Sequence, residues 1–178
     1  MRRILKIFKL DVQRLIGTEP TFFKILKLVI MEVAVQSVLL YRIQDFFTNK
    51  KIYFLAKLIR NLNLYLTGAE FCIGAKIGPG LIIRHPNGIV VGSGTVIGEN
   101  CTILQQVTLG EKYGDGRDIY HKYPKIGNNV VISAGAKIIG GVHVGDNVTI
   151  GANAVVTKDI PNNSVAIGVP AKVIEPKN

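Results

Sequence analysis

Histidine titrates near neutral pH and is therefore the side chain best suited to proton transfer. This chain of 178 residues contains three histidines, His85, His121 and His143. The sequence after His85 is Pro-Asn-Gly, which is typical of a turn, so His85 is either a general base or a residue of that turn. The chain has no Gly-x-Ser-x-Gly motif and no cysteine beside a histidine, so the sequence does not indicate a covalent nucleophile.

The segment that must position these histidines repeats every six residues from Phe71 onward. An aliphatic or aromatic residue recurs in three blocks, at positions 71, 77 and 83, then 91, 97, 103 and 109, then 126, 132, 138, 144, 150 and 156. A period of six fits neither a helix nor a single strand. It fits one face of a three-sided coil, so three repeats complete a turn and successive coils stack into a β-solenoid.

Two interruptions of this period contain two of the three histidines. One step is eight residues long rather than six and contains His85. Another is seventeen residues long, and its insertion at 111–125 contains His121. Departures from a repeat are where function is commonly placed, so both interruptions are candidate functional segments. His143 lies in the regular repeat and is expected at the surface.

Composition changes sharply near residue 66. Eighteen of the 19 glycines lie between Gly68 and Gly168, whereas residues 1–65 hold 12 Lys and Arg against 4 Asp and Glu. Apolar residues recur at helical spacing in this first part, which predicts helices, including a long one over about residues 22–47. We therefore expect a helical N-terminal region over residues 1–65 and a solenoid domain over residues 66–178.

The apolar and basic N-terminal region has two interpretations: its apolar faces pack on the solenoid or on sister subunits, or its basic surface rests on anionic lipid. The most apolar stretch, 28–41, contains Glu32 and is too short to span a bilayer comfortably. No signal peptide is evident, so we expect a cytoplasmic protein, with the inner face of the membrane as the alternative. No nucleic-acid motif accompanies the charge. Cys72 and Cys101 lack CxxC spacing and are expected to be small buried residues of a reducing compartment.

Three stretches carry a resemblance to a known family: IGPGLIIRHPNGIVVGSGTVIGENCTILQQVTLG (77–110), PKIGNNVVISAGAKIIGG (124–141) and VVTKDIPNNSVAIGVPAKVI (155–174). They resemble the hexapeptide-repeat acyltransferases, and within them the serine O-acetyltransferase branch with its short relatives from polysaccharide clusters. The resemblance covers about residues 68–175. It implies a mainly β fold, a left-handed parallel β-helix, and a homotrimer with active sites between subunits. It also implies acetyl-CoA as co-substrate and an alcohol as acceptor.

The resemblance further implies that His85 is the general base and that Glu70, fifteen residues earlier, orients it. An alcohol is a poor nucleophile at neutral pH, and a histidine held by a carboxylate takes its proton as the oxygen attacks the thioester. The candidate acceptor-binding residues are Arg84, Asn87, His121, Lys122 and Tyr123. The candidate donor-binding residues are small residues and two lysines: Gly110, Ala134, Gly135, Ala136, Ala152, Ala154, Lys158 and Lys172. The three histidines do not follow the spacing of the zinc-dependent γ-type carbonic anhydrases, so no metal site is predicted.

Two positions depart from the serine enzymes. Arg84 stands where they carry Asp, and Lys122-Tyr123 stands where they carry Arg-His. A cation in place of a carboxylate that holds an ammonium group favours a sugar hydroxyl over free serine. We therefore predict an acetyl-CoA-dependent O-acetyltransferase that acts on a sugar of a surface polysaccharide or its precursor. The alternatives are a serine O-acetyltransferase of cysteine biosynthesis and a non-catalytic β-helix scaffold.

Overall fold

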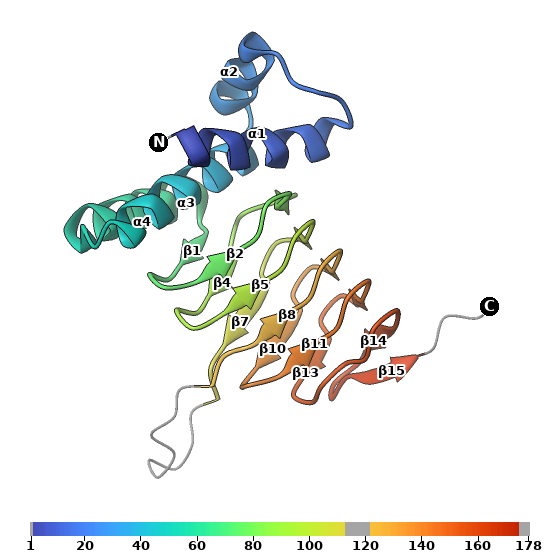
Figure 1. Ribbon diagram of the computed structural model, residues 1–178. Coiled ribbons are helices and arrows are strands. Elements are labelled where there is room, and N and C mark those ends of the chain that lie inside the picture. Colours follow the sequence, from blue (N-terminus) through green and yellow to red (C-terminus); the bar gives the residue numbers. More distant parts are fainter. Residues whose placement is uncertain (1, 113–121, 175–178) are drawn as a thin grey trace.

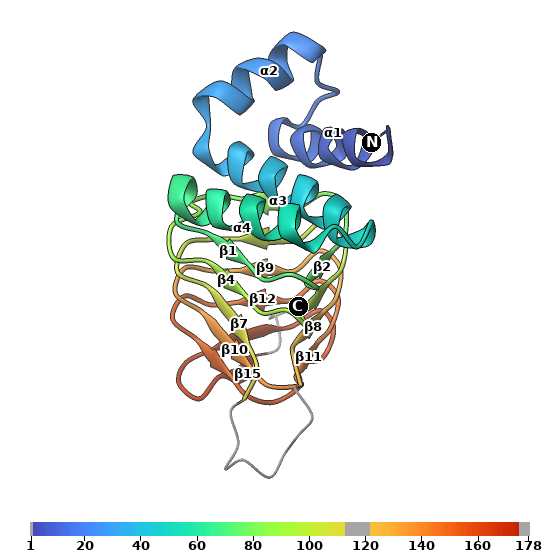
Figure 2. The same ribbon diagram turned by 90° about the vertical axis from the view of Figure 1, so that its left-hand side faces the viewer.

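The computed structural model of the chain describes residues 2–112 and 122–174. Four helices gather at one end of a three-sided prism of short strands, and the last strands lie at the other end (Figure 1). Viewed from the side, the helices lie over the first coil of the prism (Figure 2). The predicted architecture, a small helical region followed by a repeat solenoid, is therefore confirmed.

The helices are α1 (Arg2–Ile16), α2 (Phe22–Met31), α3 (Val33–Asn49) and α4 (Tyr53–Thr67). Thr21 caps α2, because its hydroxyl oxygen accepts a hydrogen bond from the backbone nitrogen of Lys24. Glu32 has an extended backbone, with φ −116° and ψ 105°, so the single helix predicted over residues 22–47 is instead two helices. Gly68 caps α4 in the left-handed conformation, so the helix continues to Thr67, two residues beyond the predicted end of the helical region.

The strands form three sheets, one on each side of the prism. The first sheet consists of β1 (Glu70–Phe71), β4 (Val90–Val91), β7 (Thr108–Gly110), β10 (Lys137–Ile139) and β13 (Val155–Val156). The second sheet consists of β2 (Lys76–Ile77), β5 (Val96–Ile97), β8 (Lys125–Ile126) and β11 (His143–Val144). The third sheet consists of β3 (Ile82–Ile83), β6 (Thr102–Ile103), β9 (Val131–Ile132), β12 (Thr149–Ile150), β14 (Val165–Ile167) and β15 (Lys172–Ile174). All pairings are parallel except that of β14 with β15.

Neighbouring strands in each sheet come from successive coils, which confirms that three six-residue repeats make one turn. Val91 pairs with Leu109, 18 positions later, and Ile126 pairs with Val144 at the same offset. The offset is 20 where Phe71 pairs with Val91, because that coil contains the eight-residue step. The two extra residues therefore bulge at a corner and leave the strand register intact.

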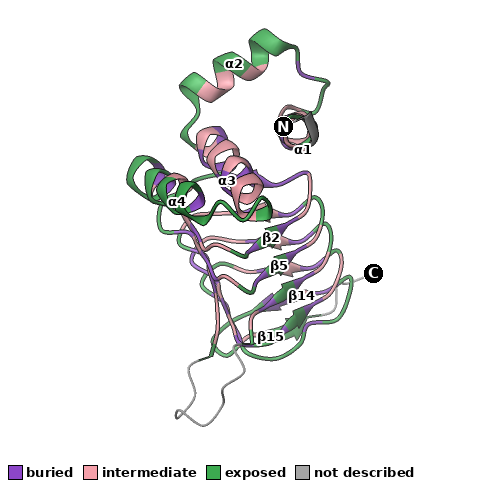
Figure 3. Cartoon of the chain, turned by 60° about the vertical axis from the view of Figure 1, so that its left-hand side comes forward, coloured by how far each residue is buried: buried purple, intermediate pink, exposed green. Residues whose placement is uncertain are grey.

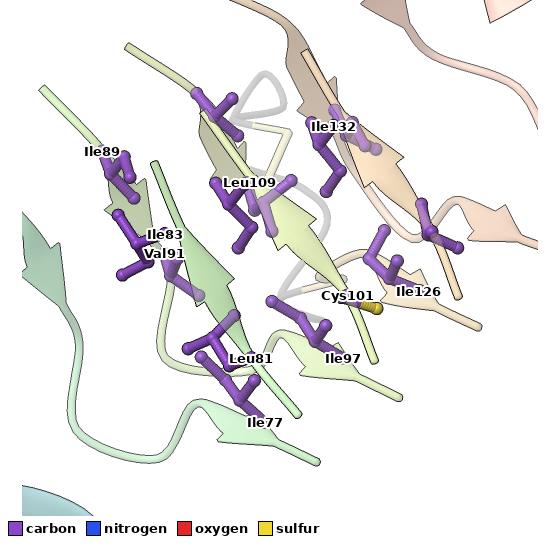
Figure 4. Close-up of a cluster of buried hydrophobic side chains, with 14 of the residues drawn as sticks. Ile77, Leu81, Ile83, Ile89, Val91, Ile97, Cys101, Leu109, Ile126 and Ile132 are labelled. Atoms are coloured by element: carbon purple, nitrogen blue, oxygen red, sulfur yellow. The ribbon is translucent and has the colours of Figure 1, made fainter. Parts of the chain in front are cut away.

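The repeated aliphatic positions fill the interior of the prism (Figure 4). The side chains at all thirteen predicted positions are buried. The small or β-branched residues that stand two positions earlier are buried as well: Ala75, Thr95, Cys101, Val107, Val130, Ala136, Val148 and Ala154. Burying one large aliphatic side chain contributes about 1.5–3 kcal/mol, so the six-residue period alone predicts the principal stabilising core.

Glycine and asparagine share the tight positions of the coils. A Cβ on Gly98 would lie 2.7 Å from the carbonyl oxygen of Gly127 in the next coil, so no side chain fits there. Asn129 and Asn147 have positive φ angles of 56° and 57°, which asparagine tolerates better than most residues. The side-chain amide of Asn129 also donates to that of Asn147 at 3.1 Å. Asparagine as well as glycine therefore builds the tight turns of the coils.

Side chains from α1 and α3 cover the open edge of the first coil. Arg42 in α3 donates to the carbonyl oxygens of Ile77 and Gly78 at 2.6 and 2.7 Å, and to both carboxylate oxygens of Asp11 in α1. Asp11 also accepts a hydrogen bond from the backbone nitrogen of Leu81. Arg42 and Asp11 are 4% and 2% exposed, so the ion pair lies inside the junction. The helices thereby satisfy backbone groups that another coil would otherwise have paired.

The helices differ in how far they are buried (Figure 3). α3 contributes six buried residues to the junction, whereas α2 contributes none. Arg14 in α1 is also structural, because it donates to the carbonyl oxygens of Gly80 and Cys101 and to the hydroxyl of Thr102. Across the described ranges, no helix is long and apolar enough to cross a membrane.

Candidate active site

His85 lies at the corner between β3 and β4, inside the eight-residue step. The backbone of this corner is fixed to both neighbouring coils: Gly88 donates to the carbonyl of Gly68 at 2.9 Å, and the carbonyl of Asn87 accepts from Gln106 at 3.0 Å. The side chain of His85 is exposed and forms no hydrogen bond with the part of the chain that the structure describes. His85 is thus a turn residue, and its imidazole is accessible from solvent.

The edge of the prism that begins at His85 continues through the equivalent corner of each later coil. Gln105 lies at the next corner, and its carbonyl accepts a hydrogen bond from Gly135 at the one after. Ala134 and Ala152 occupy the later corners and are at least partly exposed. Because strands in a sheet lie about 4.8 Å apart, the edge from His85 to Ala152 is about 14 Å long. Three of the predicted donor-binding residues therefore share one edge with His85.

Three other predicted donor-binding residues lie away from this edge. Gly110 and Lys158 stand at corners that lead from the first sheet to the second, and Lys172 lies on β15. The side chains of Ala136 and Ala154 are fully buried and belong to the core, and their contact with a donor stays a prediction. The predicted donor-binding residues therefore do not all lie on one edge of a single chain.

Glu70 begins β1 and is half-buried. Its Oε1 atom accepts a hydrogen bond from Arg60 in α4 and lies 3.7 Å from the sulfur of Cys72. Within the described chain Glu70 forms no hydrogen bond with His85, so the pairing of these two residues stays a prediction. Arg60 was not predictable, because nothing in the sequence of a helix indicates which basic side chain will reach a strand.

A cleft of about 250 Å³ opens beside the His85 corner. Its walls are mostly apolar and come from α1, α2, α3 and β3: Leu15, Ile16, Leu28, Ala34, Val35 and Ile83. Two charged residues, Glu32 and Arg84, complete the lining. Both are exposed, and neither forms an ion pair with the described residues. Glu32 reaches the cleft because it stands at the break between α2 and α3, which the sequence analysis did not predict.

The end of the cleft near Arg84 is positively charged. Burial lowers the pKa of Arg14 most, and the nearby charge of Arg84 also lowers it. The two guanidinium groups therefore lie close enough to repel each other, while Arg14 is held by backbone carbonyls. An anionic group is favoured beside Arg84, and a cationic group is favoured beside Glu32.

Two further acceptor-binding candidates, Lys122 and Tyr123, lie at a different corner of the prism. His121 is outside the described residues. Lys122 packs its side-chain stem against Gly141, and the ring of Tyr123 covers Gly92 so closely that a Cβ there would clash with it. Tyr123 also accepts a hydrogen bond from the hydroxyl of Ser93 at 3.2 Å. Tyr123 thus anchors one end of the insertion, between the first and second sheets, whereas His85 lies between the third and the first.

The two thiols and the described histidine of the regular repeat, His143, lie apart from the His85 corner. Cys72 and Cys101 are free; Cys101 is buried as expected, and Cys72 is only half-buried. Burial raises the pKa of both thiols, so both stay protonated at neutral pH and are poor nucleophiles. His143 is exposed, as expected. Among the residues that the structure describes, no group of three His, Cys, Asp or Glu side chains is placed to bind a metal.

Comparison with known proteins decides the family. A Helicobacter pylori protein named serine acetyltransferase is 39% identical over 164 residues, which make up 92% of this chain and 94% of that protein. The chain belongs to the serine acetyltransferase family. Residues 123–158 also match the family described as bacterial transferase hexapeptide (six repeats).

Solved structures of the serine acetyltransferase family agree with this assignment. The Neisseria gonorrhoeae enzyme in complex with serine gives a TM-score of 0.84 at 30% identity, over 97% of this chain and 69% of that one. The Brucella abortus enzyme in complex with coenzyme A gives 0.87 at 28% identity, over 99% of this chain and 70% of that one. This serine acetyltransferase homologue therefore spans about two thirds of the length of these solved enzymes.

Membership in the serine acetyltransferase family confirms two predictions. The solenoid is a left-handed parallel β-helix, and the chain is an acetyl-CoA-dependent acyltransferase rather than a non-catalytic scaffold. The handedness does not follow from the repeat period, which is the same for a coil of either hand. The resemblance supplied it.

Proposed function

We propose that this chain transfers an acetyl group from acetyl-CoA to the hydroxyl of serine, with His85 as the general base. The observation that carries the proposal is the position of His85. Its free imidazole stands at the head of an edge lined by small residues and beside a cleft that holds one acid and one base. The relatives named serine acetyltransferase, which match nearly the whole chain, support the same acceptor.

In the proposed reaction, His85 accepts the proton of the acceptor hydroxyl while the hydroxyl oxygen attacks the thioester carbon. The carbon–sulfur bond then breaks, and the imidazolium of His85 returns its proton to the departing sulfur. Positioned acid–base catalysis of this kind accelerates a reaction by about 10²–10⁴-fold. Ala134, Gly135 and Ala152 carry little or no side chain and would let the extended arm of the donor approach the backbone below His85.

The two charges of the cleft fit an α-amino acid. Arg84 is placed to pair with the carboxylate of the acceptor, and Glu32 is placed to pair with its ammonium group. Taken alone, Arg84 favours an acceptor that carries an acidic group, such as an acidic sugar. With Glu32 in the same cleft, an acidic sugar would gain one ion pair but would also face a like charge. The structure of the cleft and the family relatives therefore favour serine. The thiol-release assay below compares serine with sugar acceptors.

We also propose that the active site is completed between subunits of a homotrimer. The support is the division of the candidate residues between two edges of the prism. Arg84, Asn87 and His85 lie on one edge, whereas Lys122 and Tyr123 lie on another. A second copy packed alongside would bring its own insertion to the His85 edge of the first.

The deciding experiment measures thiol release from acetyl-CoA with serine, nucleotide sugars and acidic oligosaccharides as acceptors. We expect turnover with serine, and a loss of about 10²–10⁴-fold in kcat for His85→Ala. His143→Ala is the matched control, because His143 is exposed on the regular repeat, and it should keep full activity. Turnover of a sugar in the absence of turnover of serine would overturn the acceptor, and full activity of His85→Ala would overturn the mechanism.

A further inference from the structure

The outward face of α2 is apolar although nothing in the described chain covers it. Phe22, Phe23 and Ile30 are 73%, 80% and 64% exposed, and Leu26 is also exposed. With 100° between successive residues, Phe22, Leu26 and Ile30 form one stripe, and Phe23 lies beside it. An ordinary surface helix exposes polar residues, and exposed apolar patches of this kind mark interaction surfaces.

The inward face of α2 already has its partners. Ile25, Leu28 and Val29 are partly buried and pack against the hydrophobic core. The exposed stripe is therefore not a misplaced core face. α2 is apolar on two sides: one side packs on the protein, and the other stays open at the end of the molecule farthest from the last coil (Figures 1 and 3).

The charges of α2 indicate what meets the open face. Lys24 and Lys27 are both exposed, and the helix contains no acidic residue. A second copy of this face would bring lysines against lysines with no carboxylate on α2 to pair with them. An anionic lipid surface offers hydrocarbon for the aromatic rings and phosphates for the ammonium groups.

We propose that α2 rests on an anionic membrane surface, with Phe22, Phe23, Leu26 and Ile30 in the boundary between headgroups and acyl chains and with Lys24 and Lys27 on the lipid phosphates. The contact is peripheral. It needs no change in the fold, because the face is already exposed. Arg14 and Arg42 take no part in this contact, because both donate to backbone carbonyls inside the protein.

The test is co-sedimentation of the full chain with vesicles of phosphatidylcholine alone and with phosphatidylglycerol added. We expect binding only to the anionic vesicles. The double variant Phe22→Ser with Phe23→Ser should weaken it by about tenfold or more. The double variant Lys24→Gln with Lys27→Gln should weaken it by about thirtyfold, from about 1 kcal/mol per lysine near the surface. Higher salt should weaken binding of the wild type.

Two control variants remove exposed side chains of the same kinds from the prism, away from α2. Ile167→Ser with Val169→Ser removes two exposed apolar side chains, and Lys125→Gln removes one exposed lysine. Both should bind vesicles like the wild type, and thermal unfolding should show that every variant is folded. Equal binding by the wild type and the Phe22/Phe23 variant would overturn the proposal, as would no binding at all. A wild type that is a larger assembly than this variant in light scattering would also overturn it, because a second copy would then cover the face.

Discussion

Glu32 and Arg84 are 52 positions apart in the sequence, and they line one cleft next to His85. The position of each residue in the cleft has a different structural origin. Arg84 is held by the turn that the two extra residues of the coil create, and Glu32 is held by the break between two helices. The phase break made Arg84 and His85 predictable from the sequence. Glu32 and Arg60 were not predictable, because helical spacing says neither where an apolar helix will break nor which side chain will cross to a strand.

Substituting the two charged residues of the cleft should have opposite effects on the inhibition constants of two simple competitors of serine. Glu32→Gln should raise the inhibition constant of ethanolamine, which has an ammonium group only, by about tenfold to a hundredfold, because a charged hydrogen bond contributes about 1.5–3 kcal/mol. The same variant should leave 3-hydroxypropanoate, which has a carboxylate only, unchanged. Arg84→Gln should show the reverse pattern. The measurement is the competition of each compound against serine in the thiol-release assay.

Equal effects of both substitutions on both competitors would show that the cleft does not read the two charges separately. That result would not contradict His85 as the general base, because the activity of His85→Ala is measured in a separate experiment. No competition by either compound, combined with turnover of a sugar, would instead return the acceptor to the sugar that Arg84 alone favours.

The repeat determines where the strands of the coils lie, whereas tertiary contacts determine where the helices begin and end. The six-residue period predicted the core positions and the order of the strands, because each coil meets the same steric demands as the one before it. Helix boundaries were predicted less well: Glu32 splits α2 from α3, and α4 continues to Thr67. The junction between the two parts depends on Arg42 and Asp11, whose partners are backbone groups that no sequence pattern identifies.

The junction makes a prediction about stability. Asp11→Ala removes the carboxylate and leaves the buried guanidinium of Arg42 without a charged partner, which should lower the free energy of unfolding by about 3–5 kcal/mol. Lys9→Ala is the control, because it breaks the exposed ion pair with Glu19 and should change the midpoint of thermal unfolding little. Circular dichroism during heating measures both. Equal midpoints for Asp11→Ala and the wild type would contradict the role given to this pair.

The whole molecule has a second exposed apolar face, on α4, besides the one on α2. Phe54 and Tyr65 are 72% and 82% exposed, and Leu58 and Leu62 are exposed as well. α4 lies over the first sheet next to β1, so a neighbouring copy that stands alongside the prism would meet both the helix and the edge where the insertion begins. We infer that this face is covered within the proposed trimer.

The trimer is testable with one substitution on α4. The wild type should have the mass of three chains in light scattering after size exclusion. Phe54→Glu should give a smaller species, because a carboxylate replaces an apolar contact, and it should lose thiol-release activity together with the assembly. Phe22→Ser is the comparison variant, and it should remain trimeric and active. A wild type that is monomeric and fully active would contradict an active site shared between subunits.

The two ends of the prism also determine how the protein behaves at high concentration. A stack of parallel strands that ended without a cover would offer the next molecule a row of free amide and carbonyl groups, which is the geometry from which fibrils grow. Here Arg42, Arg14 and their helices occupy one end, and β15 folds back antiparallel on β14 at the other. The helical region therefore does more than border the cleft: it limits the stack to a fixed number of coils and keeps the protein a discrete particle.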